Sequence, residues 1–140
     1  MVNERLVLPA SLARELFKHA RAELPNEACG LLAGDLATGR ATAFHPTRNE
    51  EASPLRYTVH RDDLVRVIFG IEDAGQDLVG IFHSHTHTPA VPSPTDHRSA
   101  LYPDAFYVLA SLSEPDTSAA ALRAWRISDG TSREVPLTIE

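Results

Sequence analysis

Residues 83–96 read HSHTHTPAVPSPTD, and the rest of the chain is organised around this stretch. The run before it, residues 78–82, is apolar, uncharged and partly β-branched, which is typical of a buried strand. In an extended chain alternate side chains share a face, so His83 and His85 point the same way with Cα atoms about 6.5 Å apart. Two imidazoles at that spacing can bind one metal ion. The stretch therefore predicts a metal site at the end of a strand.

Such a site needs a third ligand, because zinc in a catalytic site usually takes three protein ligands and keeps a fourth position open. Asp96 is the nearest acidic residue downstream. Residues 93–96 have the pattern of a helix start, with Ser93 as N-cap, a proline at the first helical position and an acid at the third. Ser93 and Asp96 can be a capping pair only, or a capping pair that also aims a carboxylate at a metal. A second overlapping pair, His85 and His87, leaves the choice of histidines open at this point.

The spacing of these residues resembles that of the JAMM, or MPN+, zinc metallopeptidases. Their signature is an upstream glutamate, then His-Ser-His, then Ser-x-x-Asp, with the aspartate eleven residues after the second histidine. His83, His85, Ser93 and Asp96 match this register. Glu27 lies in the matching upstream context, PNEACGLLAG at residues 25–34. The resemblance covers nearly the whole chain.

The resemblance implies a zinc ion bound by His83, His85 and Asp96, because the register to Asp96 favours these two histidines over His87. It implies that Glu27 is the general base that accepts a proton from the attacking water, and the Ser93 hydroxyl is expected to hydrogen-bond the oxyanion. The implied fold is a mixed α/β (α+β) fold of the cytidine-deaminase-like JAMM/MPN type. In that fold helices flank a curved central sheet.

Compact bacterial members of this family, the Mec-type peptidases, are the most similar subgroup. The similarity rests on residues 25–34, on HSHT at 83–86, on residues 92–96 and on the Asn49 to Tyr57 stretch. These enzymes release cysteine from the C-terminus of a ubiquitin-like sulfur carrier protein. The implied substrate is therefore a carrier that ends in Gly-Gly and is joined to cysteine, as in cysteine biosynthesis. Its tail is expected to pair with a short strand predicted over residues 57–59.

Two alternatives within the family are a deubiquitinase-like isopeptidase acting on ubiquitin-like conjugates and a non-catalytic MPN scaffold. Deubiquitinating members carry a second insertion near the site, whereas only eight residues separate Asp96 from the strand predicted at Ala105. Scaffold members lose the ligands, and here every signature position is filled. A cupin-like oxygenase also begins with H-x-H but needs a glutamate soon after, and none occurs between Glu72 and Glu114.

Composition and charge fit one domain over residues 1–140, with 43% hydrophobic and 23% charged residues. No apolar run approaches the roughly 18 residues of a membrane span, and the first residues lack a signal-peptide core, so a cytoplasmic location is expected. A net charge of −6 and a single lysine, Lys18, argue against nucleic acid as a partner. The single cysteine, Cys29, suits a reducing compartment and is predicted to be a buried small hydrophobe.

Periodicity and turn signals predict the remaining elements. Glycines bound residues 34–39, a hairpin-like turn between the strands predicted at 28–33 and 40–44, and Asp129-Gly130 marks a tight turn near the end. The predicted buried stripe of the helix beginning at residue 61 or 62 is Leu64, Val65, Val67, Ile68 and Ile71. The predicted helices cover residues 9–24, 61–74 and 95–102, and the predicted strands cover residues 28–33, 40–44, 57–59, 78–82, 105–110, 121–127 and 134–139.

Overall fold

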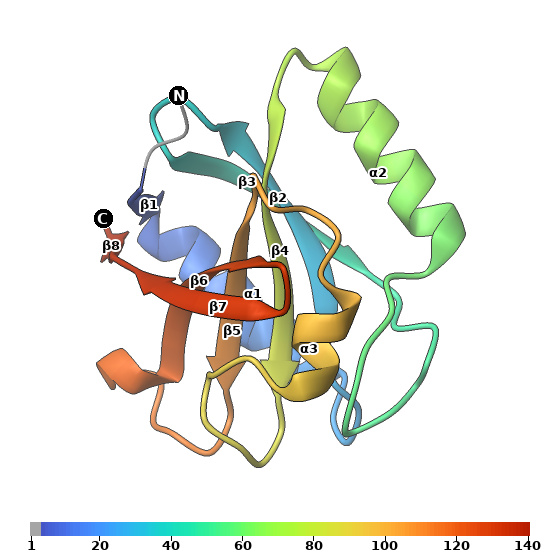
Figure 1. Cartoon of the computed structure of the whole chain (residues 1–140), viewed down its shortest axis with the longest axis vertical. Coiled ribbons are helices and arrows are strands. Elements are labelled where there is room, and N and C mark those ends of the chain that lie inside the picture. The colour runs from blue at the N-terminus through green and yellow to red at the C-terminus, as the bar shows by residue number, and fades with distance from the viewer. Residues whose placement is uncertain (1–3) are drawn as a thin grey trace.

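One strongly curved, mixed sheet forms the centre of the computed structural model, which describes residues 4–140 (Figure 1). The strand order is β7-β6-β5-β4-β2-β3-β1-β8. The strands are β1 (Leu6–Leu8), β2 (Cys29–Asp35), β3 (Arg40–Thr47), β4 (Asp77–His85), β5 (Phe106–Ser111), β6 (Leu122–Ser128), β7 (Thr131–Val135) and β8 (Leu137–Ile139). The helices are α1 (Ala10–Ala22), α2 (Arg61–Asp73), α3 (Pro94–Ser99) and the 3₁₀ turn η1 (Ala119–Ala121).

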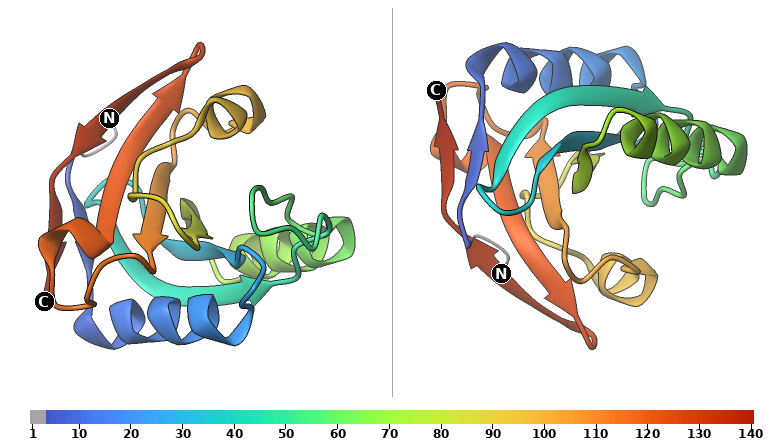
Figure 2. Two further views of the ribbon diagram at one scale, coloured as in Figure 1. Left: turned by 90° about the horizontal axis from the view of Figure 1, so that it is seen from below. Right: turned by 90° about the horizontal axis from the view of Figure 1, so that it is seen from above.

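The two faces of the sheet bury two separate clusters of apolar side chains. Leu16 of α1 packs in the cluster that contains Phe82 of β4, and Val67 of α2 packs in the cluster that contains Ile81. Because successive side chains of a strand point to opposite faces, His83 and His85 lie on the same face as Ile81. Figure 2 shows α1 against one side of the curved sheet, with α2 and α3 away from it. The alternation along β4 therefore places both histidines on the side of α2 and α3.

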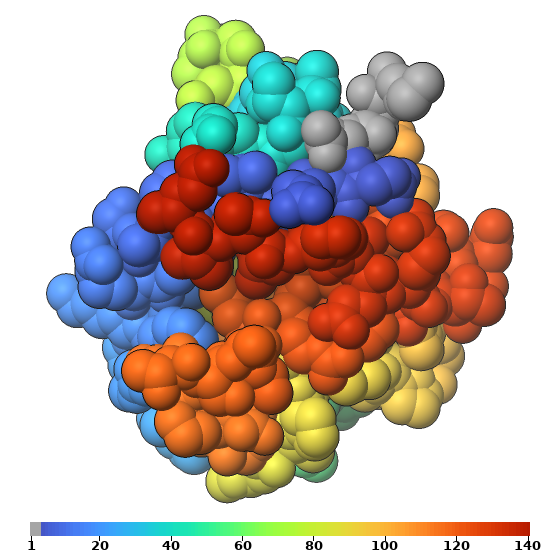
Figure 3. All heavy atoms as spheres, turned by 90° about the vertical axis from the view of Figure 1, so that its left-hand side faces the viewer, coloured from blue at the N-terminus to red at the C-terminus, as the bar shows by residue number. Residues whose placement is uncertain are grey.

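The two ends of the strand order are joined by a single residue, Pro136, which lies between β7 and β8. β7 pairs with β6, whereas β8 pairs in parallel with β1, Leu6 opposite Leu137. The Leu6 N–H also donates to the Pro136 carbonyl at 3.0 Å. Figure 3 shows β1 and the C-terminal strands side by side across this face of the molecule. The sheet thus curls until its first and last strands meet.

Most predicted elements are present with shifted ends, but several predictions are wrong. Residues 57–59 form no strand, and Val59 makes only an isolated bridge to Asn49. The strand predicted at 40–44 continues through Pro46, because β1 reaches β3 only at Arg40 and so requires no N–H from the proline. The last predicted strand is divided by Pro136, and β1 and η1 were not predicted.

The exposed face of α2 also differs from the prediction. Val65 was expected in the buried stripe but is exposed, as is Phe69. The helix itself begins at Arg61 as expected, and Gly75 follows it with a φ of 69°, the left-handed conformation that glycine adopts without strain. Among the described residues, no helix is both long enough and apolar enough to cross a membrane.

Candidate active site

Three potential metal ligands converge at the end of β4. The Nε2 atoms of His83 and His85 are 3.3 Å apart, and Asp96 Oδ2 is 3.1 Å from each of them. All three side chains are buried. Neighbouring ligands around a tetrahedral ion at about 2.0–2.1 Å lie about 3.3 Å from each other, so the observed spacing fits such an ion. Among the described residues, His83, His85 and Asp96 form a group whose ligand atoms could hold one metal ion. His87 is exposed and does not belong to this group.

The hydrogen bond of His85 to the loop is compatible with a cation at this place. Its Nδ1 lies 2.8 Å from the Pro89 carbonyl, which can only accept, so the neutral ring carries its proton on Nδ1 and a lone pair on Nε2. Burial would raise the pKa of Asp96, but the two imidazoles and the Ser93 N–H hold it well below its usual range. A lone pair and a carboxylate oxygen would then face each other at 3.1 Å. A cation bound by both atoms removes that repulsion, and the donor set therefore fits a metal.

The start of α3 fixes the third ligand. The Ser93 hydroxyl accepts from the Asp96 N–H at 3.1 Å, and the Ser93 N–H donates to Asp96 Oδ2 at 2.9 Å. This is the reciprocal capping box expected from the sequence, with Pro94 at the first helical position. The carboxylate oxygen that the box holds is the one that faces both histidines. The carboxylate that completes the capping box is therefore also the one that faces the two histidines, and the proton of the Ser93 hydroxyl can be donated elsewhere.

Glu27 lies beside this group, in the connection between α1 and β2. Its N–H donates to the Ser53 carbonyl at 2.8 Å, and its side chain is only 4% exposed. Its Oε1 has no hydrogen-bond partner among residues 4–140. Burial raises the pKa of Glu27 to about 8, with smaller opposing effects of His85, which lowers it, and Asp96, which raises it. A cation bound nearby would favour the carboxylate form.

The loop after β4 is held by three consecutive carbonyl groups, each of which accepts from a different strand. The Thr88 carbonyl accepts from Ser111 Oγ of β5 at 2.7 Å, and the Pro89 carbonyl accepts from His85 of β4 at 2.8 Å. The Ala90 carbonyl accepts from Trp125 Nε1 of β6 at 3.0 Å. Outer hydrogen bonds of this kind fix the orientation of a metal-binding histidine. The loop is therefore a rigid support for His85.

A second loop, residues 48–60, covers the other side of the site and is organised by Asn49. The Asn49 side-chain amide donates to the Glu27 carbonyl at 3.0 Å and to the Arg56 carbonyl at 3.1 Å. Its Oδ1 accepts from the Thr58 N–H at 3.0 Å. One side chain therefore ties the backbone of Glu27 to the two residues on either side of Tyr57.

The base of this loop is fastened to α2 by Asp63. Asp63 Oδ2 accepts from the backbone N–H of Arg48 at 2.8 Å, and Oδ1 accepts from its guanidinium at 2.9 Å. The Arg48 guanidinium and backbone N–H hold the pKa of Asp63 well below its ordinary value. We expect Asp63→Asn to lower the free energy of unfolding at neutral pH by about 1.5–3 kcal/mol, the usual range for hydrogen bonds to a charged group. Urea unfolding measures this change.

The pH dependence of stability gives a stricter check of the Asp63 contact. A carboxyl whose pKa is depressed in the folded chain contributes stability above its unfolded pKa of about 3.9, and this contribution is lost as the pH falls. Between about pH 6 and pH 3 the original chain should therefore lose more stability than Asp63→Asn does. Asp62→Asn makes the same change at an exposed neighbouring position and should behave like the original chain. Equal pH slopes for the Asp63 variant and the original chain would contradict the assignment.

The structure brings together all the site residues expected from the sequence, Glu27, His83, His85, Ser93 and Asp96. The residues that hold them were not predictable from sequence patterns, because the hydrogen bonds from Ser111 and Trp125 join segments far apart along the chain. One signal was available for Trp125, since a buried indole N–H normally finds an acceptor. Trp125 is buried, and it also anchors the loop beside the site. Cys29 is buried, as expected.

Comparison with known proteins agrees with this geometry. The family described as prokaryotic homologs of the JAB domain matches residues 9–128. The chain is 41% identical over 134 residues to the CysO-cysteine peptidase of Mycobacterium tuberculosis, covering 96% of this chain and 90% of that protein. It is 38% identical over 116 residues to a desampylase of Haloferax volcanii, covering 79% and 84% of the two chains.

A solved structure supports the same fold. The solution structure of a protein from Desulfitobacterium hafniense superposes with a TM-score of 0.85 at 30% identity, covering 96% of this chain and 92% of that one. The family match extends over most of the sequence and includes Glu27, both histidines of β4 and Asp96. The chain therefore belongs to the family of prokaryotic homologues of the JAB domain, and it is an enzyme of the hydrolase class.

Proposed function

We propose that the chain is a zinc-dependent peptidase that cuts the bond after the C-terminal glycine of a ubiquitin-like sulfur carrier protein and releases cysteine. The observation that carries the proposal is the convergence of three metal donors beside a buried glutamate with an unpaired oxygen. This convergence occurs in a chain that is 41% identical to a CysO-cysteine peptidase. A cytoplasmic location remains a prediction.

His83, His85 and Asp96 are the proposed zinc ligands. Two imidazoles and a carboxylate are a usual donor set for catalytic zinc and leave one position for water or substrate. When bound, zinc would polarise the scissile carbonyl and lower the pKa of water. Asp96 is held by the capping box and His85 by Pro89, so both ligands are oriented by the protein itself.

Glu27 is the proposed general base. Burial raises the pKa of Glu27 to about 8 without a metal, and a cation bound nearby would favour the carboxylate, which is the form that accepts a proton. In this role Glu27 takes a proton from the attacking water and passes it to the leaving amine. The hydroxyl of Ser93 donates to the oxyanion that forms on the carbonyl, and losing one such donor reduces the rate by about 10²–10³-fold in other enzymes.

The proposed partner is a carrier protein with a Gly-Gly end joined to cysteine. Of the two relatives described above, one is named for cysteine attached to a carrier and the other as a desampylase. The short connection from Asp96 to β5 adds little surface for gripping a second folded protein on the leaving side. A leaving group as small as one amino acid fits this limit. A broader isopeptidase activity is the alternative that the desampylase relative favours.

Mass spectrometry of a carrier–cysteine adduct incubated with the zinc-loaded protein tests the substrate. We expect the adduct to lose one cysteine residue, and a chelator should prevent the loss. Glu27→Gln serves as the matched control, because it changes the proposed base without removing a proposed ligand. Survival of the adduct, with cleavage of an isopeptide bond between two folded proteins, would overturn the substrate assignment and favour the isopeptidase alternative.

A further inference from the structure

The two histidines of the proposed metal site are supported in different ways. His85 has an outer hydrogen bond, from Nδ1 to the Pro89 carbonyl. His83 is fully buried, and its Nδ1 has no hydrogen-bond partner among residues 4–140. An outer hydrogen bond usually fixes the ring orientation of a metal-binding histidine. The orientation of His83 must therefore come from another contact.

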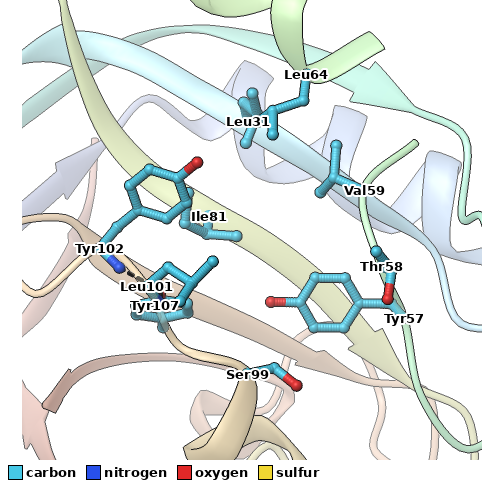
Figure 4. Close-up of a pocket in the computed structure, with 10 residues that line it drawn as sticks. All are labelled: Leu31, Tyr57, Thr58, Val59, Leu64, Ile81, Ser99, Leu101, Tyr102 and Tyr107. Carbon is cyan, nitrogen blue, oxygen red and sulfur yellow. Dashed lines mark hydrogen bonds between the residues drawn. The ribbon is translucent and has the colours of Figure 1, made fainter. Parts of the chain in front are cut away.

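That contact is an aromatic stack with Tyr57. The two rings have centroids 4.3 Å apart and an interplanar angle of 20°, so they lie nearly parallel. Tyr57 comes from the loop over residues 48–60, and its ring covers one face of the His83 ring. Figure 4 shows its hydroxyl directed into the adjacent cavity of about 130 Å³. The ring of Tyr57, and not its hydroxyl, contacts the histidine.

The backbone on either side of Tyr57 is hydrogen-bonded to one side chain, that of Asn49. The Asn49 side chain donates to the Arg56 carbonyl and accepts from the Thr58 N–H, at 3.1 Å and 3.0 Å. The same side chain donates to the Glu27 carbonyl at 3.0 Å. The stack is therefore part of a fixed loop and is tied to the residue proposed as the base.

We propose that Tyr57 is a positioning residue for the metal. By stacking on His83 it limits rotation of the imidazole and keeps Nε2 directed at Asp96, replacing the hydrogen bond that His83 Nδ1 does not make. This inference rests on the proposed metal site. The positioning role belongs to the ring of Tyr57, so loss of the ring should affect metal binding and loss of the hydroxyl should not.

Three variants test the inference through metal affinity instead of catalytic rate. Tyr57→Leu removes the aromatic ring, and Tyr57→Phe removes only the hydroxyl. Tyr102→Leu is the control, because it removes another tyrosine ring that lines the same cavity (Figure 4). The apparent dissociation constant for zinc is measured by competition with a chromogenic chelator. We expect Tyr57→Leu to weaken binding by about 10–100-fold, the range for loss of an outer-shell partner. Tyr57→Phe and Tyr102→Leu should bind zinc as the original chain does.

A second readout reports on geometry. The visible absorption bands of the cobalt(II)-substituted protein should shift in Tyr57→Leu and be restored in Tyr57→Phe, and thermal unfolding of the metal-free proteins shows whether each variant is folded. Equal zinc affinity in Tyr57→Leu and the original chain overturns the inference. So does equal weakening in Tyr57→Leu and Tyr102→Leu, which would indicate a general effect of the cavity. If the original chain itself binds no zinc, the proposed function fails first, and the two failures are thus distinct.

Discussion

His85→Ala is expected to bind zinc more than about 100-fold more weakly than the original chain and to lose measurable hydrolysis. Loss of an outer-shell partner alone weakens metal binding by about 10–100-fold, and this change removes a donor atom itself. The Nε2 of His85 lies 3.3 Å from that of His83 and 3.1 Å from Asp96 Oδ2, so its removal leaves only two of the three converging donor atoms. Elemental analysis of the purified protein gives the zinc content directly.

His87→Ala is the matched control, because the same residue type is removed two positions further along the chain. His87 is exposed, whereas His85 is buried. The His87 variant should keep stoichiometric zinc and its activity. The opposite pattern, with zinc retained in His85→Ala and lost in His87→Ala, would show that the second overlapping histidine pair holds the metal.

Glu27→Gln should keep zinc and lose hydrolysis by about 10²–10⁴-fold, the usual contribution of general acid–base catalysis. The amide has nearly the same shape as the carboxyl group but cannot accept the proton. Because Glu27 lies outside the group of metal donors, its replacement leaves all three proposed ligands in place. Turnover of the carrier–cysteine adduct and zinc content are measured on the same preparation.

Two other results for Glu27→Gln would contradict the assignment. Turnover close to that of the original chain would exclude Glu27 as the base. Loss of zinc would instead show that this side chain supports the metal group structurally. Glu50→Gln makes the same chemical change at an exposed position in the neighbouring loop and should leave both quantities unchanged.

The convergence of the three proposed ligands was predictable because the signals for it are local. Alternation along a strand places His83 and His85 on one face, and a capping pattern four residues long marks the start of the helix that holds Asp96. Both signals depend only on the nearest neighbours in the chain. The order of helices and strands was predictable for the same reason, since apolar residues recur with a period of 2 in strands and of 3.6 in helices.

The supports of the site were not predictable from such patterns. The stack of Tyr57 on His83 and the bond from Trp125 to the Ala90 carbonyl join segments that meet only after the sheet has formed. Residues 57–59 have the composition of a strand, but the Asn49 side chain binds the Arg56 carbonyl and the Thr58 N–H, and Val59 makes only an isolated bridge. Tertiary context overrides local propensity at these positions.

The pairing of β1 with β8 has a consequence for how the chain folds. It places Leu6 opposite Leu137, more than a hundred positions apart, and it cannot form until the last strand has been synthesised. Contacts between such distant segments require a large loss of chain entropy before they stabilise anything, which is why folds rich in them fold in milliseconds to seconds. The hairpins β2–β3 and β6–β7 join consecutive strands, so their formation requires a smaller loss of chain entropy. Closure of the sheet at Pro136 is therefore expected to be a late event of folding.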